Sequence, residues 1–262
     1  MVGKLLLRYF THGRKTKLIQ FNRPLKEGLY SDFTNRDQLL ELIRFKSTKA
    51  DGYTSLAEYK ERMLPDQKAI YFITGEGENT LRNSPLLEAY KKRDIEVLIA
   101  DDDIDEVVVP TIGTYEEIEL KSVNRSDAGE DLQAEKDEQK EQDLGPVVEK
   151  IKKALGDRVK DVKVSVRLSD SPSCIVVDEN DPTMKMQQLL KAMGQTDTSE
   201  VKPILEINPD HELVKRLKTT EDESYVEDMS VLLLDQALLV ENVPIKEPAE
   251  FVRRMNRVLE RA

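Results

Sequence analysis

The chain has 262 residues, of which 39% are hydrophobic and 35% charged, and its formal net charge is −11. This length favours two domains, because domains commonly contain roughly 100–200 residues. The acidic balance argues against nucleic acid and against an anionic membrane as the main partner. The single cysteine, Cys174, excludes an internal disulfide and fits a reducing compartment, so we expect a cytoplasmic protein without a membrane segment.

The N-terminal part divides into a tail and a helical segment. Residues 1–22 are basic and lack a periodic pattern, so we interpret them as a separate, atypical tail. Residues 23–63 predict short helices. Leucines at helical spacing lie between Asp37 and Phe45, and Ser55 followed by Glu58 predicts a capping box.

Residues 66–123 predict a strand–helix–strand unit. The β-rich apolar runs 69–74 and 96–100 are typical of buried strands, and Ser84-Pro85 between them opens a helix. Short links make this a βαβ unit, in which the two strands are parallel. We also expect a short helix at 105–111 and an edge strand at 115–123. The first domain is therefore expected to span residues 23–123.

The stretch 124–143 is almost wholly polar and predicts a charged linker between the domains. Residues 144–262 predict a second domain of the α+β class that ends in a helical hairpin. Its expected strands are 162–168, 174–177 and 204–207. Its expected helices are 146–155, 182–193, one after Asn208-Pro209-Asp210, 224–240 and 248–261.

Two segments could suggest an enzyme, and both have a simpler interpretation. Gly75-Glu-Gly77 follows a predicted strand but lacks the third glycine of a dinucleotide fingerprint and the Lys-Ser/Thr of a P-loop. Glu76 and Glu78 would also repel phosphate. The acidic run 101–106 lacks calcium-loop spacing, and acidic residues stabilise a helix N-terminus in any case.

The remaining reactive residues form no catalytic pattern. His12 lies in the tail, and His211 lies in the first turn of a predicted helix, where capping is the expected role. Cys174 lies in an apolar strand and is expected to be a buried hydrophobic residue. We therefore predict no catalytic residue, no cofactor ligand and no metal ligand, and we expect that the chain is not an enzyme.

The helix at 182–193 carries Met186, Leu189, Leu190 and Met193 within a narrow arc. Such a stripe usually packs on the protein's own sheet, which the pattern alone favours. Methionine is flexible and polarisable, however, so an adaptable binding surface is the alternative.

The last two helices favour self-association about as much as packing within the chain. The helix at 224–240 is apolar nearly all round and needs cover from several sides, whereas the final helix has a single apolar stripe. Pairing with a second copy into a four-helix bundle would cover both. The candidate dimer contacts are Leu232, Leu233, Leu234, Ala237, Leu238, Phe251, Met255 and Leu259.

Several segments together resemble one family. Those at 25–33, 42–45, 54–59 and 83–88 are similar to the middle domain of the heat-shock-ninety chaperones. Those at 156–162, 208–214, 232–239 and 251–256 resemble the C-terminal domain of that family, in its bacterial, HtpG-type form. The resemblance runs from about Arg23 to the end of the chain.

This resemblance implies a homodimeric, ATP-driven chaperone of the stress response that binds unfolded or partly folded client proteins and dimerises through a four-helix bundle. It implies client contacts on the helix that carries Met186, Leu189, Leu190 and Met193. A further client contact is implied at Val107, where the family has an aromatic residue. ATP and magnesium are the cofactors of the full-length family.

The family's ATPase domain and the front of its middle domain have no counterpart in this sequence. We therefore expect a fragment of an HtpG-type chaperone that binds no cofactor and hydrolyses no ATP, and that arises from a truncated or disrupted reading frame. The alternatives are an adaptor or dominant-negative fragment that pairs with a full-length chaperone, and an α/β enzyme built on residues 69–123.

Overall fold

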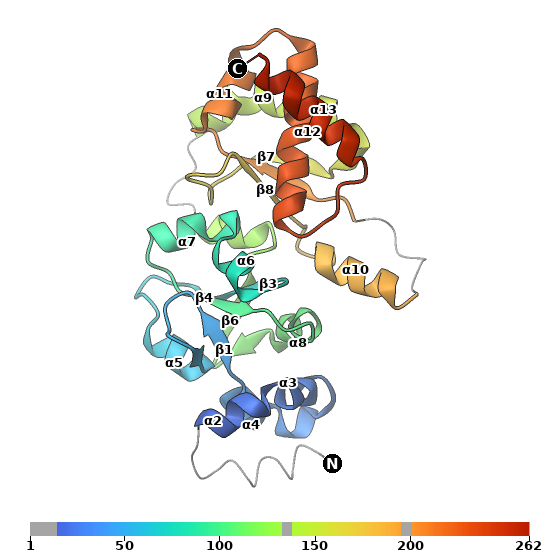
Figure 1. The fold of residues 1–262 in the computed structure, drawn as a ribbon. Coiled ribbons are helices and arrows are strands. Elements are labelled where there is room, and N and C mark those ends of the chain that lie inside the picture. Colours follow the sequence, from blue (N-terminus) through green and yellow to red (C-terminus); the bar gives the residue numbers. More distant parts are fainter. Residues whose placement is uncertain (1–14, 133–137, 195–200, 262) are drawn as a thin grey trace. The chain divides into compact units, whose positions relative to one another are not determined.

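The computed structural model describes residues 15–132, 138–194 and 201–261. It divides into two compact units (Figure 1). Unit 1 comprises the chain up to Asn83 together with Tyr90–Val123, and unit 2 comprises Ser84–Ala89 together with Asn124–Ala262. Within the described ranges, the longest apolar helix is still too short or too polar to span a membrane.

Unit 1 is a mixed sheet with helices. Its elements are α2 (Lys15–Gln20), α3 (Asn22–Ser31), η1 (Phe33–Asn35), α4 (Arg36–Leu42), β1 (Phe45–Ser47), β2 (Tyr53–Thr54), α5 (Leu56–Glu61), β3 (Ala69–Thr74), α6 (Glu78–Arg82), the end of α7 (Glu88–Lys92), β4 (Val97–Ala100), α8 (Asp105–Ile112), β5 (Thr114–Tyr115) and β6 (Ile118–Ser122).

The sheet of unit 1 has the strand order β2-β1-β4-β3-β6-β5. The parallel pairing of β3 with β4 confirms the predicted βαβ unit, and every residue of β3 is buried. The expected edge strand at 115–123 is wrong, because β6 pairs with β3 on one side and with β5 on the other. Glu116 and Glu117 both have positive φ and form the tight turn that folds β5 back along β6, so β5 is the edge.

The helical segment of unit 1 differs from its prediction at both ends. The helix expected to reach Phe45 ends at Leu42, and Phe45 begins β1, which pairs with β4. That pairing spans a long sequence separation, so local spacing did not reveal it. At the other end α2 lies within the expected tail, and Leu18 is buried in the core of unit 1.

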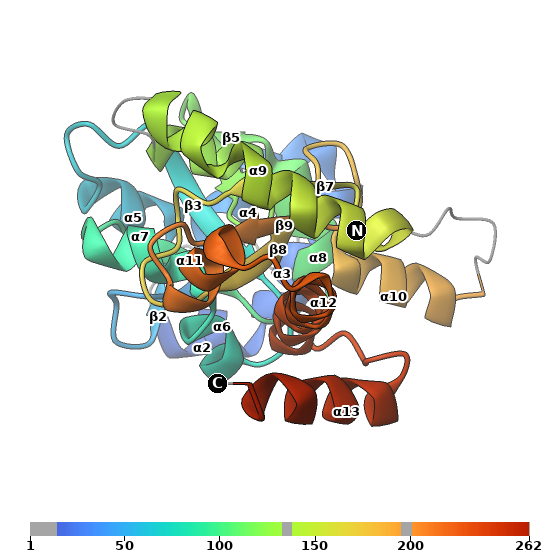
Figure 2. The ribbon, with the colours of Figure 1, turned by 90° about the horizontal axis from the view of Figure 1, so that it is seen from above.

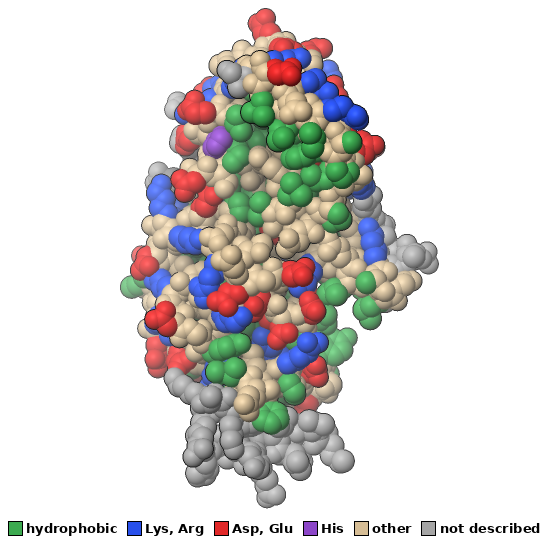
Figure 3. Space-filling view, viewed as in Figure 1, with side chains coloured by type: hydrophobic (Ala, Val, Ile, Leu, Met, Phe, Trp, Pro, Cys, Tyr) green, Lys and Arg blue, Asp and Glu red, His purple; other side chains and the backbone are tan. Residues whose placement is uncertain are grey.

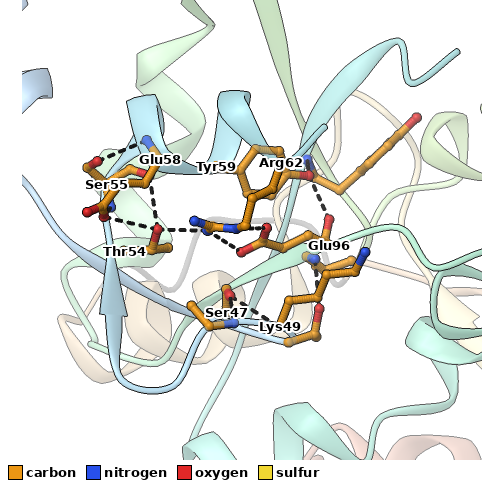
Figure 4. Close-up of polar contacts among 12 residues, drawn as sticks. Ser47, Lys49, Thr54, Ser55, Glu58, Tyr59, Arg62 and Glu96 are labelled. Atoms are coloured by element: carbon orange, nitrogen blue, oxygen red, sulfur yellow. Dashed lines mark hydrogen bonds and ion pairs between the residues drawn. The ribbon is translucent and has the colours of Figure 1, made fainter. Parts of the chain in front are cut away.

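The predicted capping box is confirmed and belongs to a larger polar network (Figure 4). Arg62 donates from Nε and Nη2 to the two carboxylate oxygens of Glu96, each at 2.8 Å. Tyr59 Oη donates to the Glu96 carbonyl at 2.6 Å. Because the Glu96 side chain is only 2% exposed, this paired carboxylate holds α5 against the start of β4.

Unit 2 is a small sheet with helices packed against it. Its elements are η2 (Pro85–Leu87), the start of α7, η3 (Asp127–Leu132), α9 (Glu138–Leu155), η4 (Gly156–Arg158), β7 (Asp161–Val164), β8 (Ser173–Val176), α10 (Met184–Ala192), β9 (Ile204–Ile207), α11 (Glu212–Thr219), α12 (Glu223–Val240) and α13 (Pro248–Leu259). The strand order is β7-β9-β8, with β7 parallel and β8 antiparallel to β9. Seen from above, α13 is an outermost helix of this unit and lies beside α12, which it contacts (Figure 2).

The strand expected at 162–168 ends at Val164, because Arg167 turns inward. Arg167 is fully buried, and its Nε donates to Glu206 Oε2 at 3.0 Å. Ser165 Oγ donates to the same oxygen at 2.7 Å. A Cβ atom on Gly129 would lie 2.6 Å from Arg167 Nη2, so only glycine leaves room for the guanidinium. A buried ion pair thus replaces the second half of the expected strand.

Part of the stretch expected to be a linker is packed in unit 2. Ala128 and Leu132 of η3 are buried, and Val177 N–H donates to the Asn124 carbonyl at 3.0 Å. The helix expected to begin at Pro146 begins at Glu138, so Pro146 lies inside α9. A few apolar residues are enough to anchor a polar stretch when their side chains are buried in the same unit.

Candidate interaction surfaces

The loop Gly75-Glu-Gly77 offers no phosphate cradle. Lys46, the nearest cation from a strand, is already paired with Glu78 Oε2 at 3.0 Å and with Asp101 Oδ2 at 2.7 Å. Hydrogen bonds from Lys46 and Arg82 lower the pKa of Glu78, so the Glu78 carboxylate stays charged beside the loop. A phosphate at this position would meet fixed negative charge.

The acidic run 101–106 is neutralised by cations of the chain itself. Asp101 pairs with Lys46, and the buried Asp105 pairs with Lys26 at 2.6 Å. Burial raises the pKa of Asp105 despite this partner. Among the residues that the structure describes, no group of three His, Cys, Asp or Glu side chains is arranged to hold a metal ion. The run therefore acts as ion pairs and as a helix start.

His211 and Cys174 have the structural roles that were predicted. His211 is the N-cap of α11, where its Nδ1 accepts from the Leu213 N–H at 3.2 Å. Cys174 is buried in β8, and burial raises the pKa of its thiol well above the ordinary value. A thiol with a raised pKa is a poor nucleophile at neutral pH. His12 lies outside the described residues.

The seam between α12 and α13 is an ion-pair network around one buried carboxylate. Asp228 of α12 accepts from Arg254 Nη1 at 2.9 Å, from Arg257 Nε at 2.8 Å and from Arg257 Nη2 at 2.7 Å. The hydrogen bond from Arg257 is the main cause that lowers the pKa of Asp228. Val258 is buried on the same side of α13. These contacts fix which face of α13 meets α12.

The opposite face of α13 is apolar and uncovered. Val252 is 47% exposed, Met255 38% and Leu259 63%, and this spacing places all three on one side of the helix. At the end of α12, Leu239 and Val240 are 46% and 38% exposed. Figure 3 shows hydrophobic side chains gathered around α12 and α13. We call these five residues the α13 face.

The structure corrects the reason given for the predicted dimer contacts. Leu233, Leu234 and Ala237 of α12 are buried within the chain itself and need no second copy to cover them. Leu232, Leu238 and Phe251 are half-buried. Met255 and Leu259 are exposed, on the helix that was expected to be well covered. Val252, Leu239 and Val240 were not predicted, although Val252 lies one turn before Met255.

The apolar arc of α10 is only partly covered. Gln187, expected on the outer side, is buried, and Met184 packs against the core of unit 2. Met186, Leu189 and Leu190 are half-buried, and Met193 is 75% exposed. Packing of this stripe on the sheet and its use as a binding surface therefore both stay predictions. In unit 1, Val107 of α8 is half-buried.

Comparison with known proteins places these surfaces in a family. The family model described as "Hsp90 protein" matches residues 15–262. The chain belongs to the Hsp90 family. It is 55% identical over 250 residues to the chaperone protein HtpG of Treponema denticola, and 50% identical over 252 residues to HtpG of Treponema pallidum, with 92% and 93% of the chain covered. The HtpG of Aliarcobacter butzleri is 50% identical over 248 residues.

The Hsp90-family match confirms the resemblance and corrects two expectations. The expected loss of the ATPase domain, and with it the expectation that this protein is not an enzyme, is wrong. The family model runs through the chain from residue 15, and HtpG chaperones align with more than nine-tenths of it, so the chain matches as a regular family member. The chain spans 39% of the length of these relatives.

Proposed function

We propose that this Hsp90-family chain forms the dimer contact and a client-binding surface of an HtpG-type chaperone. The observation that carries the proposal is the exposed apolar face of α13, together with the exposed Met193 at the end of α10, in a chain of which 35% is charged. Apolar side chains that gather on the surface of a heavily charged protein mark interaction sites.

The α13 face supports a contact between two copies. It lies at a helical hairpin, where two-fold pairing of hairpins gives a four-helix bundle. The apolar residues of the α13 face are surrounded by charged side chains such as Arg253 and Glu260. An apolar centre with a charged rim is the usual composition of a stable protein interface.

The α10 face supports binding of unfolded clients. Met193 is exposed, Met186, Leu189 and Leu190 are half-buried, and methionine adapts to many apolar partners without fixed geometry. Val107 of unit 1 is a further client contact in this proposal. In the family such binding assists folding under stress in the cytoplasm and is driven by ATP with magnesium.

The Gly75–Gly77 loop does not fit a nucleotide, since it is flanked by carboxylates and Lys46 is already paired. The same observations leave the alternative of an α/β enzyme on residues 69–123 without support.

Sedimentation velocity tests the dimer contact. The wild-type chain is expected to be a dimer at micromolar concentration, and Val252→Ser with Met255→Ser is expected to give a monomer whose folding is intact by circular dichroism. Lys215→Ser on α11, also exposed, is the matched control and should remain a dimer. A monomeric wild type at that concentration would exclude the assignment.

A further inference from the structure

Two cations hold the base of α10, and the proposed function does not account for them. We call the stretch from Asp178 to Met193 the α10 arm. It leaves the sheet after β8 and carries the apolar arc. The side chains of Arg125 and Lys160 both contact its first residues.

The Arg125 side chain donates hydrogen bonds to backbone carbonyls in the arm's first turn. Its Nη1 lies 3.1 Å from the Asp178 carbonyl and 3.0 Å from the Asp181 carbonyl, and it also donates to the carbonyl of Glu179. The backbone of Arg125 is itself fixed, because it bridges to Val177 and its carbonyl accepts from the buried Arg167 at 3.1 Å. The guanidinium therefore reaches the turn from a rigid position.

Lys160 contacts the chain where it leaves the sheet and where it returns. Its Nζ pairs with Asp178 Oδ2 at 2.7 Å and with Asp181 Oδ2 at 2.9 Å. Its backbone N–H donates at 2.8 Å to the carbonyl of Pro203, the residue before β9. One residue next to β7 thus joins the start of the arm to the strand that follows it.

The turn fixes which side of α10 is buried. Asp181 N–H donates to the Asp178 carbonyl at 3.1 Å, and Pro182 then restricts the backbone before the helix. Thr183 caps α10 by accepting from the Met186 N–H at 3.1 Å. Thr183 and Gln187 are both buried, whereas Met186 is half-buried.

We propose that Arg125 and Lys160 are positioning residues that hold α10 so that its half-buried apolar arc and the exposed Met193 can meet a client. This inference rests on the proposed role of α10 in client binding. The Lys160 side chain is 45% exposed, and its two carboxylate partners are 41% and 34% exposed. Ion pairs of this kind contribute little to global stability. Their loss is therefore expected to loosen the arm and leave the rest of unit 2 folded.

The test compares Arg125→Ala/Lys160→Ala with Lys152→Ala in the full chain. The control removes an exposed lysine–aspartate pair of 2.8 Å, between Lys152 and Asp161, that includes no residue of the arm. Amide hydrogen exchange at 186–193 should become at least about tenfold faster in the double variant, with β8 and β9 unchanged, and should not change in the control. Binding of reduced, carboxymethylated lactalbumin, a permanently unfolded probe, should weaken several-fold. Lys160→Arg should exchange and bind like the wild type.

Unchanged exchange in the double variant, or equal acceleration throughout unit 2, would overturn the proposal. So would faster exchange at α10 with full binding of the probe. Met186→Ser/Leu189→Ser with both cations intact separates the two proposals. If that variant binds the probe normally, the client surface is wrong, while the exchange measurement still decides whether the cations position the arm.

Discussion

The helices α12 and α13 form one hairpin, yet the apolar side chains of α12 are mostly buried and those on one face of α13 are exposed. Leu233 and Leu234 of α12 are at most 1% exposed, whereas Leu259 of α13 is 63% exposed. The difference follows from their neighbours. α12 is contacted by β8, α9 and α13, while α13 packs mainly against α12. Apolar content alone therefore does not reveal which helix is left for a partner.

The largest loss of stability is expected for a substitution in the buried face of α12. Leu233→Ala is expected to lower the free energy of unfolding of unit 2 by about 2–5 kcal/mol, because the side chain is completely buried and leaves a cavity. Urea denaturation measures this loss. Leu239→Ala on the same helix, 46% exposed, is the control and should change the unfolding free energy by at most about 0.5 kcal/mol. Equal losses in the two variants would contradict the burial pattern.

A smaller loss of stability is expected for a substitution in the ion-pair network between α12 and α13. Asp228→Asn removes the charge that Arg254 and Arg257 share, and should lower the unfolding free energy by about 1–3 kcal/mol. The loss should be visible in urea denaturation at neutral pH. Release of α13 should also expose the ion-paired side of that helix and increase amide exchange there.

The seam also predicts a response to acid. The pKa of Asp228 is lowered in the folded protein, so its stabilisation is present above the ordinary pKa and is lost as the pH falls through the lowered value. The wild type should therefore lose more stability than Asp228→Asn below about pH 4. Glu250, whose pKa is also lowered, contributes in the same direction in both proteins. Parallel acid profiles would show that the arginines do not act through Asp228.

The smallest effect on folding should come from the open side. Leu259→Ser is expected to change the unfolding free energy of the monomer by no more than about 0.5 kcal/mol, because the side chain is mostly in water already. Urea denaturation at nanomolar concentration, where the dimer dissociates, checks this. A large loss under those conditions would mean that Leu259 packs within its own chain, and the contrast between the two helices would fail.

Much of unit 1 could be predicted from the sequence, because the patterns that define its elements involve residues close together in the chain. The strands β3 and β4 lie in short, mostly apolar runs that are buried at every strand residue, and the Ser55–Glu58 box is a short-range hydrogen-bond exchange. The strands β1 and β2 were missed because they depend on pairing with distant residues. The inward turn of Arg167 was missed for the same reason, since its partner Glu206 lies on another strand.

The interaction surfaces were predicted in part. Met186, Leu189, Leu190 and Met193 were identified as one arc, but the spacing of a helix defines its faces and not the direction in which each face points. Gln187 illustrates this, because a polar residue became the buried one. Of the predicted dimer contacts, Met255 and Leu259 are exposed, whereas Leu233, Leu234 and Ala237 are buried within the chain.

The sequence alone determined the family and the parallel βαβ unit, because each depends on residue identity at short spacing. Only the tertiary structure decided that α12 is covered, that the apolar face of α13 is exposed, and that Arg125 and Lys160 meet at the base of α10. Those outcomes depend on which distant elements pack together, and solvent exposure is a property of that packing.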